Sequence, residues 1–308
     1  MYSFIKEQAA QFSVSDLCGT LEVGRSSYYA WASGHTHQPN RELTAQVKAV
    51  FWRHSRRYGS RRITEELVAE GVVVGRDRVR TVMREQGLRA IQPKSYVPRT
   101  TDSRHGQRVS PNLLQTREPV SRPNEVVVGD ITYLPLLVGE WAYLATWLDL
   151  YSRMIVGWQV AERMTDELII GAMKQAILRR KPEAGLIVHS DRGGQYVSGE
   201  FRRLLNRHGY LQSMSRADNA YDNAFAESLF SRYKAELLEC GAFRDLAEAR
   251  LETFNYIEGY YNRLRRHSAL GYQSPEEFER EYYRKLKERS INHQEKENDL
   301  SDFSVRQN

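Results

Sequence analysis

Apolar residues recur at helical spacing through the first ninety residues of the chain. Leu43, Val47, Val50 and Phe51 fall on one face of a helix, and glycines end the two helical stretches that follow. Three helices are therefore expected here, over residues 42–54, 61–70 and 76–86. Two shorter helices, over residues 16–21 and 27–31, are expected ahead of this set. A turn at Gly24 separates the short pair, which has the pattern of a helix-turn-helix.

The third helix of the main set has an apolar stripe and a basic opposite side. Val79, Val82 and Met83 form the stripe. A basic helix that comes last in a set of three suits the major groove of DNA. An ordinary three-helix bundle with an arginine-rich surface fits the same pattern. If the helix binds DNA, the side chains expected to contact it are Arg61, Arg62, Arg76, Arg78, Arg80 and Arg84.

Strand-like runs replace this pattern after residue 124. Three consecutive strands are expected over residues 125–134, 141–150 and 154–160. Helices over 166–178, 199–208 and 223–239 then alternate with strands over 186–190 and 212–215. This order predicts an α/β core, a mixed sheet flanked by helices. Helices near 245–262 and 275–288 follow.

Five segments result from these patterns. Residues 1–40 form a helix-turn-helix-like segment and residues 41–91 a basic three-helix domain. Residues 92–124 carry five prolines without periodicity, which predicts an extended basic linker able to follow a nucleic-acid backbone. Residues 125–280 form the α/β core with its C-terminal helices. The polar end, residues 281–308, is expected to be disordered.

Charge and composition narrow the function. The chain has a net charge of +6, yet residues 25–122 hold 19 Lys or Arg against 8 Asp or Glu. This concentration suggests a polyanionic partner, although a solvated basic surface would look the same. Only two cysteines occur, without CxxC spacing, which argues against a disulfide framework or a zinc site and favours a reducing cytoplasm. No apolar run reaches the ~18 residues of a membrane helix.

Three acids stand where a carboxylate is costly unless a cation compensates it. Asp130 interrupts the first strand, in Val-Val-Val-Gly-Asp-Ile-Thr-Tyr, and Asp191 ends the fourth, in His-Ser-Asp-Arg-Gly-Gly-Gln-Tyr. Glu227 lies on a helix that can cross the mouth of the sheet. Two Mg²⁺ ions would compensate all three and equip the site for phosphate-ester chemistry. Lys234 lies two turns beyond Glu227 on the same helix face, where it can hold a phosphate.

Neighbouring polar residues have simpler expected roles. Asp149 is expected to cap the turn between two strands, and Asp222 and Asp218 to cap a helix and a loop. Glu236 is half a turn out of phase with Glu227. His189 is expected to be a structural imidazole. Arg192-Gly193-Gly194 is no phosphate-binding P-loop, and its glycines either let the backbone approach the acids or form a tight turn. A tyrosine recombinase is disfavoured because Leu270 stands where Arg is needed after His267.

With these residues in place, the chain resembles the insertion-sequence transposases of the retroviral-integrase type, specifically their second-reading-frame products. In that family 35 residues separate the last two acids of an Asp-Asp-Glu triad, and a basic residue follows the Glu by seven. Here 35 residues separate Asp191 from Glu227, and Lys234 takes the basic position. The flanking residues agree, as does a C-terminal block of Tyr261, Asn262, Arg263, Arg266, His267, Leu270, Ser274 and Pro275. The likeness covers about residues 12–278.

The resemblance implies a ribonuclease-H-like fold and a polynucleotidyl transferase that uses two Mg²⁺ (or Mn²⁺) ions held by the triad. It implies binding to double-stranded DNA, both the terminal inverted repeats of an element and the target, by a homo-oligomer. Fusion or association with an upstream-frame helix-turn-helix and coiled-coil product is also implied, so the chain alone is expected to bind ends poorly. Two alternatives remain: a resolvase or repair-type nuclease on the same fold, and a non-catalytic helix-turn-helix regulator.

Overall fold

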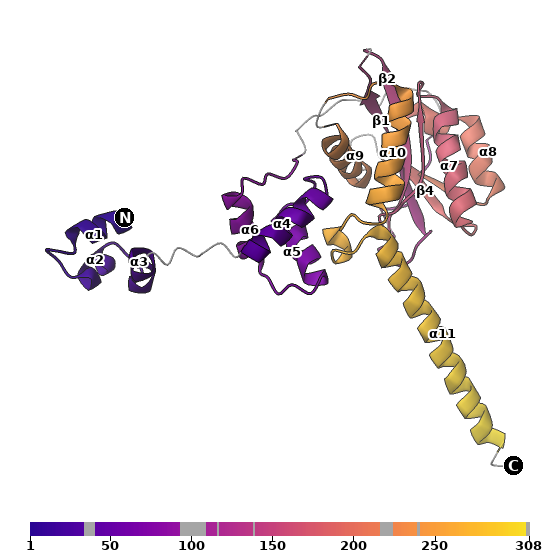
Figure 1. Cartoon of the computed structure of the whole chain (residues 1–308). Coiled ribbons are helices and arrows are strands. Elements are labelled where there is room, and N and C mark those ends of the chain that lie inside the picture. Colours follow the sequence, from indigo (N-terminus) through magenta and orange to yellow (C-terminus); the bar gives the residue numbers. More distant parts are fainter. Residues whose placement is uncertain are drawn as a thin grey trace. The chain divides into compact units, whose positions relative to one another are not determined.

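The computed structural model describes residues 1–33, 41–92, 109–115, 117–137, 139–215, 224–238 and 241–305. The chain divides into two compact units, Met1–Ala90 and Ile91–Asn308 (Figure 1). Part of the predicted linker, together with Asp218 and Asp222, lies outside the described residues. Among the described residues, no helix is both long and apolar enough to cross a membrane.

The first unit opens with three short helices. They are α1 (Tyr2–Gln8), α2 (Val14–Thr20) and α3 (Arg25–Ala32), packed around Ile5, Cys18 and Tyr28. The Ser13 side chain caps α2 by accepting a hydrogen bond from the Asp16 N–H. Helix α1 was not predicted, because Ile5 is its only buried residue and leaves no apolar periodicity to detect.

Three longer helices complete this unit, close to the predicted bounds. They are α4 (Arg41–Arg53), α5 (Ser60–Ala69) and α6 (Arg76–Glu85). The predicted apolar stripe of α6 is buried, as are the predicted apolar residues of α4. Ser60 is the first residue of α5 and Gly59 takes the N-cap position, without a side-chain cap.

A five-stranded mixed sheet forms the centre of the second unit, in the order β3-β2-β1-β4-β5. Strands β1 and β2 are antiparallel, as are β2 and β3, whereas β4 is parallel to β1 and β5 to β4. The mixed sheet predicted from the sequence is therefore confirmed. The strands are β1 (Val126–Pro135), β2 (Trp141–Asp149), β3 (Ile155–Ala161), β4 (Ile187–Ser190) and β5 (Leu211–Met214).

Helices cover both faces of this sheet. Helices α7 (Asp166–Arg180) and α8 (Gly199–Arg207) share one core with Val127 and Trp147. Figure 1 shows these two helices on one side of the strands and α9 (Ala224–Leu237) on the other. On the second face, Val126, Val128 and Ile187 pack against partly buried residues from before the sheet, Leu113, Leu114 and Val120.

Both edges of the sheet are covered by polar contacts. At the β5 edge, Met214 N–H donates to the Pro111 carbonyl at 3.3 Å, and Leu113 N–H donates to Ser213 Oγ at 2.9 Å. At the β3 edge, the Asn262 side chain bonds both the N–H and the carbonyl of Ile155, each at 3.0 Å. The segment 109–115 therefore belongs structurally to the sheet, although the sequence placed it in a linker.

The C-terminal helices depart from the predicted pattern in two places. The stretch expected as one helix is α10 (Leu246–Phe254) followed by a π-helical segment, η3 (Asn255–Tyr261). Beyond the short η4 (Ser268–Leu270), α11 runs over Pro275–Val305, through the segment expected to be disordered. Arg284 pairs with Glu281 and Glu288 along this helix, and pairs at such spacing stabilise a polar helix.

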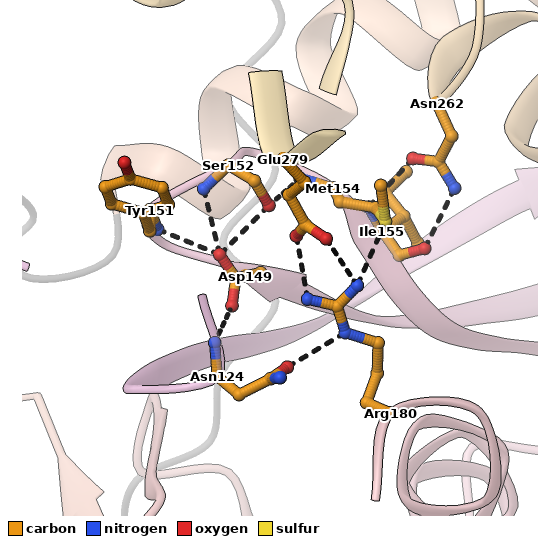
Figure 2. A network of polar contacts seen from close by, with 9 residues as sticks. All are labelled: Asn124, Asp149, Tyr151, Ser152, Met154, Ile155, Arg180, Asn262 and Glu279. Carbon is orange, nitrogen blue, oxygen red and sulfur yellow. Dashed lines mark hydrogen bonds and ion pairs between the residues drawn. The ribbon is translucent and has the colours of Figure 1, made fainter. Parts of the chain in front are cut away.

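A buried polar network connects the β2–β3 turn with α7 and α11 (Figure 2). Asp149, which is fully buried, accepts hydrogen bonds from the N–H groups of residues 124, 151 and 152 and from the Ser152 hydroxyl, at 2.7 to 3.1 Å. Its predicted role as a turn cap is confirmed. Beside it, Arg180 of α7 makes a bidentate ion pair with Glu279 of α11, at 2.6 and 2.7 Å.

Candidate active site

Asp130, on β1, and Asp191, directly after β4, occupy equivalent positions along these two neighbouring parallel strands. The β1–β4 pairing ends with Gly129 opposite Ser190, and the two aspartates come directly after these residues. Each carboxylate is held locally: Asp130 Oδ1 accepts the Ile131 N–H at 2.8 Å, and Asp191 Oδ1 accepts the Gly193 N–H at 3.0 Å. The structure thus brings two of the three predicted acids to the same place on the sheet.

Gly129 explains how β1 can present Asp130 at this position. A Cβ atom on Gly129 would lie 2.3 Å from the ring of Trp147, well inside van der Waals contact. Trp147 is only 1% exposed and stacks on Phe201, with ring centroids 5.7 Å apart, so it has little room to move. The glycine lets the strand lie flat on this ring while Asp130 points to the other face. The sequence interpretation missed this requirement.

Gly193 is the residue that lets the loop after β4 fold back on Asp191. A Cβ atom there would lie 3.1 Å from Asp191 Oδ1 and 3.5 Å from the ring of Tyr196. The Gly193 carbonyl also accepts the Tyr196 N–H at 3.0 Å, which closes a tight turn. Both roles considered for the glycine pair therefore apply at this position.

Tyr196 follows the Asp191 loop in the short helix η1 (Gly194–Val197), with its ring near the Gly193 position that Asp191 also contacts. Its ring makes edge-on contacts with Trp147 and Phe201, and the residue is 2% exposed. Burial raises the pKa of its hydroxyl well above the ordinary value, and the charges of Asp130 and Asp191 raise it further. Sequence reasoning did not single it out, although it stands only five residues after Asp191.

Helix α9 places Lys234 beside this pair. Leu229, Phe230 and Tyr233 bury the inner side of the helix, and Lys234 is half-buried. Burial lowers the pKa of Lys234, while the negative charge of Asp130 acts in the opposite direction. The predicted cation of the site therefore lies within electrostatic reach of Asp130.

Glu227 does not join the two aspartates in this structure. It is exposed and lies seven residues before Lys234, about 10.5 Å along the helix axis at 1.5 Å per residue. Near the same end of α9, the Phe225 ring contacts the Arg153 guanidinium at 4.0 Å, in the turn that precedes β3. Within the part of the chain that the structure describes, no group of three or more His, Cys, Asp or Glu side chains is placed to hold one metal ion.

The C-terminal half of α9 is tied to the helices that follow by a buried ion pair. Glu236 accepts hydrogen bonds from Arg265, at 2.8 Å to Nη2 and 3.1 Å to Nε, and from the Tyr256 hydroxyl at 2.9 Å. The Tyr233 hydroxyl pairs with that of Thr253 at 2.6 Å. The sequence placed Glu236 on a different side of the helix from Glu227, as observed, but gave no sign of its partner.

His189 has the structural role expected for it. It is fully buried, and its two ring nitrogens lie 2.8 Å from Ser213 Oγ and 3.1 Å from Ser215 Oγ. The imidazole therefore links β4, the strand that Asp191 follows, to the end of β5, and both of its ring nitrogens have a partner.

The arginines predicted to contact DNA lie in the other unit. Those of α6 are exposed around the helix, and Arg61 is exposed on α5. Arg62 is half-buried, with its guanidinium 5.6 Å from the centre of the Tyr58 ring. The exposed side chains form a basic surface on α6, namely Arg76, Arg78, Arg80 and Arg84.

Comparison with known proteins assigns both units. Residues 38–96 match the HTH-like domain family, and residues 120–220 and 208–275 match two families described as integrase core domain. Transposase InsF for insertion sequence IS3A of Escherichia coli (strain K12) is 42% identical over 283 residues, which are 90% of this chain and 98% of that protein. The insertion element IS600 31 kDa protein of Shigella sonnei is 40% identical over 87% of this chain and 98% of its own length.

Solved structures give weaker likenesses. The simian T-cell lymphotropic virus intasome in complex with PP2A regulatory subunit B56 gamma matches with a TM-score of 0.41 and 15% identity, over 76% of this chain and 74% of that one. The HTLV-2 integrase catalytic core domain in complex with magnesium matches with a TM-score of 0.38 and 20% identity, over 51% of this chain and 97% of that one.

The mixed sheet and the two domain families define the class of protein: a transposase with an integrase-type, ribonuclease-H-like catalytic core, and hence a polynucleotidyl transferase that binds DNA. Within this class, the chain belongs to the family of the InsF transposases of insertion sequence IS3. The non-catalytic regulator considered from the sequence is not the class that these relatives indicate.

Proposed function

We propose that this transposase binds the ends of an insertion element and catalyses strand cleavage and strand transfer, with Asp130, Asp191 and Glu227 as the ligands of two Mg²⁺ ions. The observation that carries the proposal is the placement of Asp130 and Asp191 one position past the paired ends of β1 and β4. The integrase core domain matches, which together span all three acids, support their assignment to the reaction centre.

The donor atoms at the aspartate pair suit such an ion. Mg²⁺ prefers carboxylate oxygens, and the Ile131 and Gly193 N–H groups fix one oxygen of each aspartate. Bound divalent ions would polarise the phosphoryl group and favour a water or 3′-hydroxyl nucleophile. Lys234 adds a positive charge beside Asp130 for a DNA phosphate.

In this proposal Glu227 approaches the aspartate pair when metal ions and DNA are bound. The approach is needed because Glu227 is exposed and, among the described residues, no three acids are grouped to hold one ion. Such an approach would change the contacts at that end of α9, among them the contact of the Phe225 ring with Arg153. The buried ion pair of Glu236 would keep the other half of α9 joined to the helices after it.

DNA recognition is assigned to the first unit. The exposed arginines of α6 and the match to an HTH-like domain support binding of the terminal inverted repeats. We further propose that the protein acts as a homo-oligomer on element ends and target DNA. Fusion or association with an upstream-frame product supplies further DNA binding, so the chain alone is expected to assemble on or bind ends poorly.

Substitution of Asp191 tests the chemistry separately from binding. In the full chain, fused to the upstream-frame product, Asp191→Asn is expected to abolish Mg²⁺-dependent joining of end oligonucleotides and to leave the gel shift of the same oligonucleotides unchanged. Glu227→Gln should act like Asp191→Asn. Glu183→Gln, which changes an exposed acid outside the site, should leave both the joining and the gel shift unchanged. The pair Arg76→Ala and Arg80→Ala should weaken the gel shift.

Three results would count against parts of this proposal. Unchanged joining by Asp191→Asn would remove the proposed catalytic role. Cleavage of branched or damaged DNA without any joining would favour the resolvase or repair-type nuclease. Joining by the isolated chain at the rate of the fused protein would show that the upstream-frame product is not needed.

A further inference from the structure

The Tyr196 hydroxyl is a buried polar group for which the described residues offer no hydrogen-bond partner. The residue as a whole is 2% exposed. A buried hydroxyl that forms no hydrogen bond costs free energy, and most such groups in proteins are paired. A phenylalanine would keep the same edge-on contacts with Trp147 and Phe201 without this cost. The hydroxyl therefore needs a reason other than packing.

Its surroundings point to the aspartate pair. The Tyr196 ring and Asp191 Oδ1 lie 3.5 Å and 3.1 Å from one and the same point, the Cβ position that Gly193 leaves empty. The backbone of Tyr196 is fixed from both sides, because its N–H donates to the Gly193 carbonyl and its carbonyl accepts from the Gln212 side chain. The charges of both Asp130 and Asp191 act on the hydroxyl. The backbone of Tyr196 is thus fixed beside the loop that holds Asp191, with its hydroxyl buried and within electrostatic reach of both carboxylates.

We propose that Tyr196 is a positioning residue, whose hydroxyl donates a hydrogen bond to the Asp130–Asp191 carboxylate pair when divalent ions are bound. The inference rests on the proposed function of that pair. In each aspartate one oxygen already accepts a backbone N–H, so a donor from Tyr196 would fix the orientation of the pair further. Outer hydrogen bonds of this kind commonly change metal affinity by about 10–100-fold.

Tyr196→Phe tests this role, with Tyr210→Phe as the matched control. The Tyr210 hydroxyl donates to the Pro182 carbonyl at 3.2 Å and belongs to the same core. In the full chain, Tyr196→Phe is expected to keep or raise the Tm and to weaken Mn²⁺ binding, followed by electron paramagnetic resonance, about tenfold. Tyr210→Phe is expected to lower the Tm and to leave Mn²⁺ binding unchanged.

A kinetic measurement gives a second readout. Joining by the fused protein, titrated with Mg²⁺, should show a half-saturating concentration about tenfold higher for Tyr196→Phe, with near wild-type joining at saturation. In the wild-type protein and in Tyr210→Phe, Mn²⁺ should also perturb the ultraviolet absorption of a buried tyrosine. This measurement needs no folded Tyr196 variant, and absence of the perturbation would contradict the inference.

The outcomes separate this inference from the proposed function. If Asp191→Asn binds Mn²⁺ as tightly as the wild type, the metal site itself is wrong. If Asp191→Asn loses Mn²⁺ but Tyr196→Phe binds it normally, only the role of Tyr196 fails. A fall in Tm for Tyr196→Phe equal to that of Tyr210→Phe, with unchanged Mn²⁺ affinity, would assign the hydroxyl to the fold alone.

Discussion

Removal of the Arg265 guanidinium should unfold the catalytic unit at a clearly lower temperature. Arg265 and Glu236 have side chains only 3% and 4% exposed, and they join through both the Nε and Nη2 atoms. Arg265→Met would leave the Glu236 carboxylate buried, still bonded to the Tyr256 hydroxyl but without the guanidinium that compensates its charge. Breaking a buried pair in this way costs about 3–5 kcal/mol, because one charge stays uncompensated in the interior.

Replacement of both partners should cost much less. In Glu236→Leu with Arg265→Met, no charge is left behind, and an apolar pair of similar volume is often neutral. The Tyr256 hydroxyl then loses its hydrogen bond to Glu236, which costs about 1–3 kcal/mol. The double variant is therefore expected to lie between Arg265→Met and the wild type. Its position in the series measures the burial cost of the lone carboxylate.

Calorimetric melting of the full chain provides the measurement. For a unit of about 200 residues, 1 kcal/mol shifts the Tm by ~2–4 °C, so Arg265→Met should lower the transition of the second unit by ~10 °C. Arg284→Met, which breaks exposed pairs on α11, should leave this transition in place. A loss in Arg265→Met no larger than in Arg284→Met, or a double variant less stable than Arg265→Met, would refute the reasoning.

Two further perturbations test other features of the second unit. Gly129→Ala should lower the free energy of unfolding in urea by about 1–3 kcal/mol, because the added Cβ would meet the Trp147 ring. Gly259→Ala, which adds a Cβ in open space, should leave the free energy of unfolding unchanged. Equal effects of the two substitutions would contradict the importance of the Gly129–Trp147 contact. Burial opposes ionisation of Glu125, but N–H hydrogen bonds and Arg117 outweigh it and lower its pKa. The ionised Glu125 carboxylate therefore stabilises the fold above pH 4.5, and this stabilisation is lost as the pH falls through the lowered pKa. Glu125→Gln should then lower the free energy of unfolding by about 1 kcal/mol at pH 7 and by progressively less in acid. A difference in Tm between the variant and the wild type that does not change with pH would contradict this prediction.

Local signals account for what the sequence predicted well. The helices of the first unit follow from apolar residues three and four positions apart and from glycines such as Gly71 and Gly87, whose positive φ ends a helix. The strands follow from apolar runs, and the turn cap of Asp149 from its place between two of them. Each of these features depends on residues close together in the sequence.

The missed features depend on residues that meet only in the folded chain. Gly129 must be glycine because of Trp147 on the next strand, and Glu236 is compensated by Arg265 from a later segment. The exposure of Glu227 follows from which side of α9 is buried by Leu229, Phe230 and Tyr233, and the spacing between Asp191 and Glu227 does not encode this. The sequence could thus propose candidate acids for the site, but not whether the folded chain gathers them.

The contacts of Pro111 and Leu113 with β5 have a practical consequence for expressing fragments of the protein. A fragment cut at residue 125, where the sequence placed the start of the core, would lack Pro111 and Leu113 and leave the outer side of β5 open. The apolar patch normally shielded by Leu114 and Val120 would be uncovered with it. Bare edges of this kind recruit other strands, so such a fragment should self-associate, while one that starts before residue 109 should stay monodisperse.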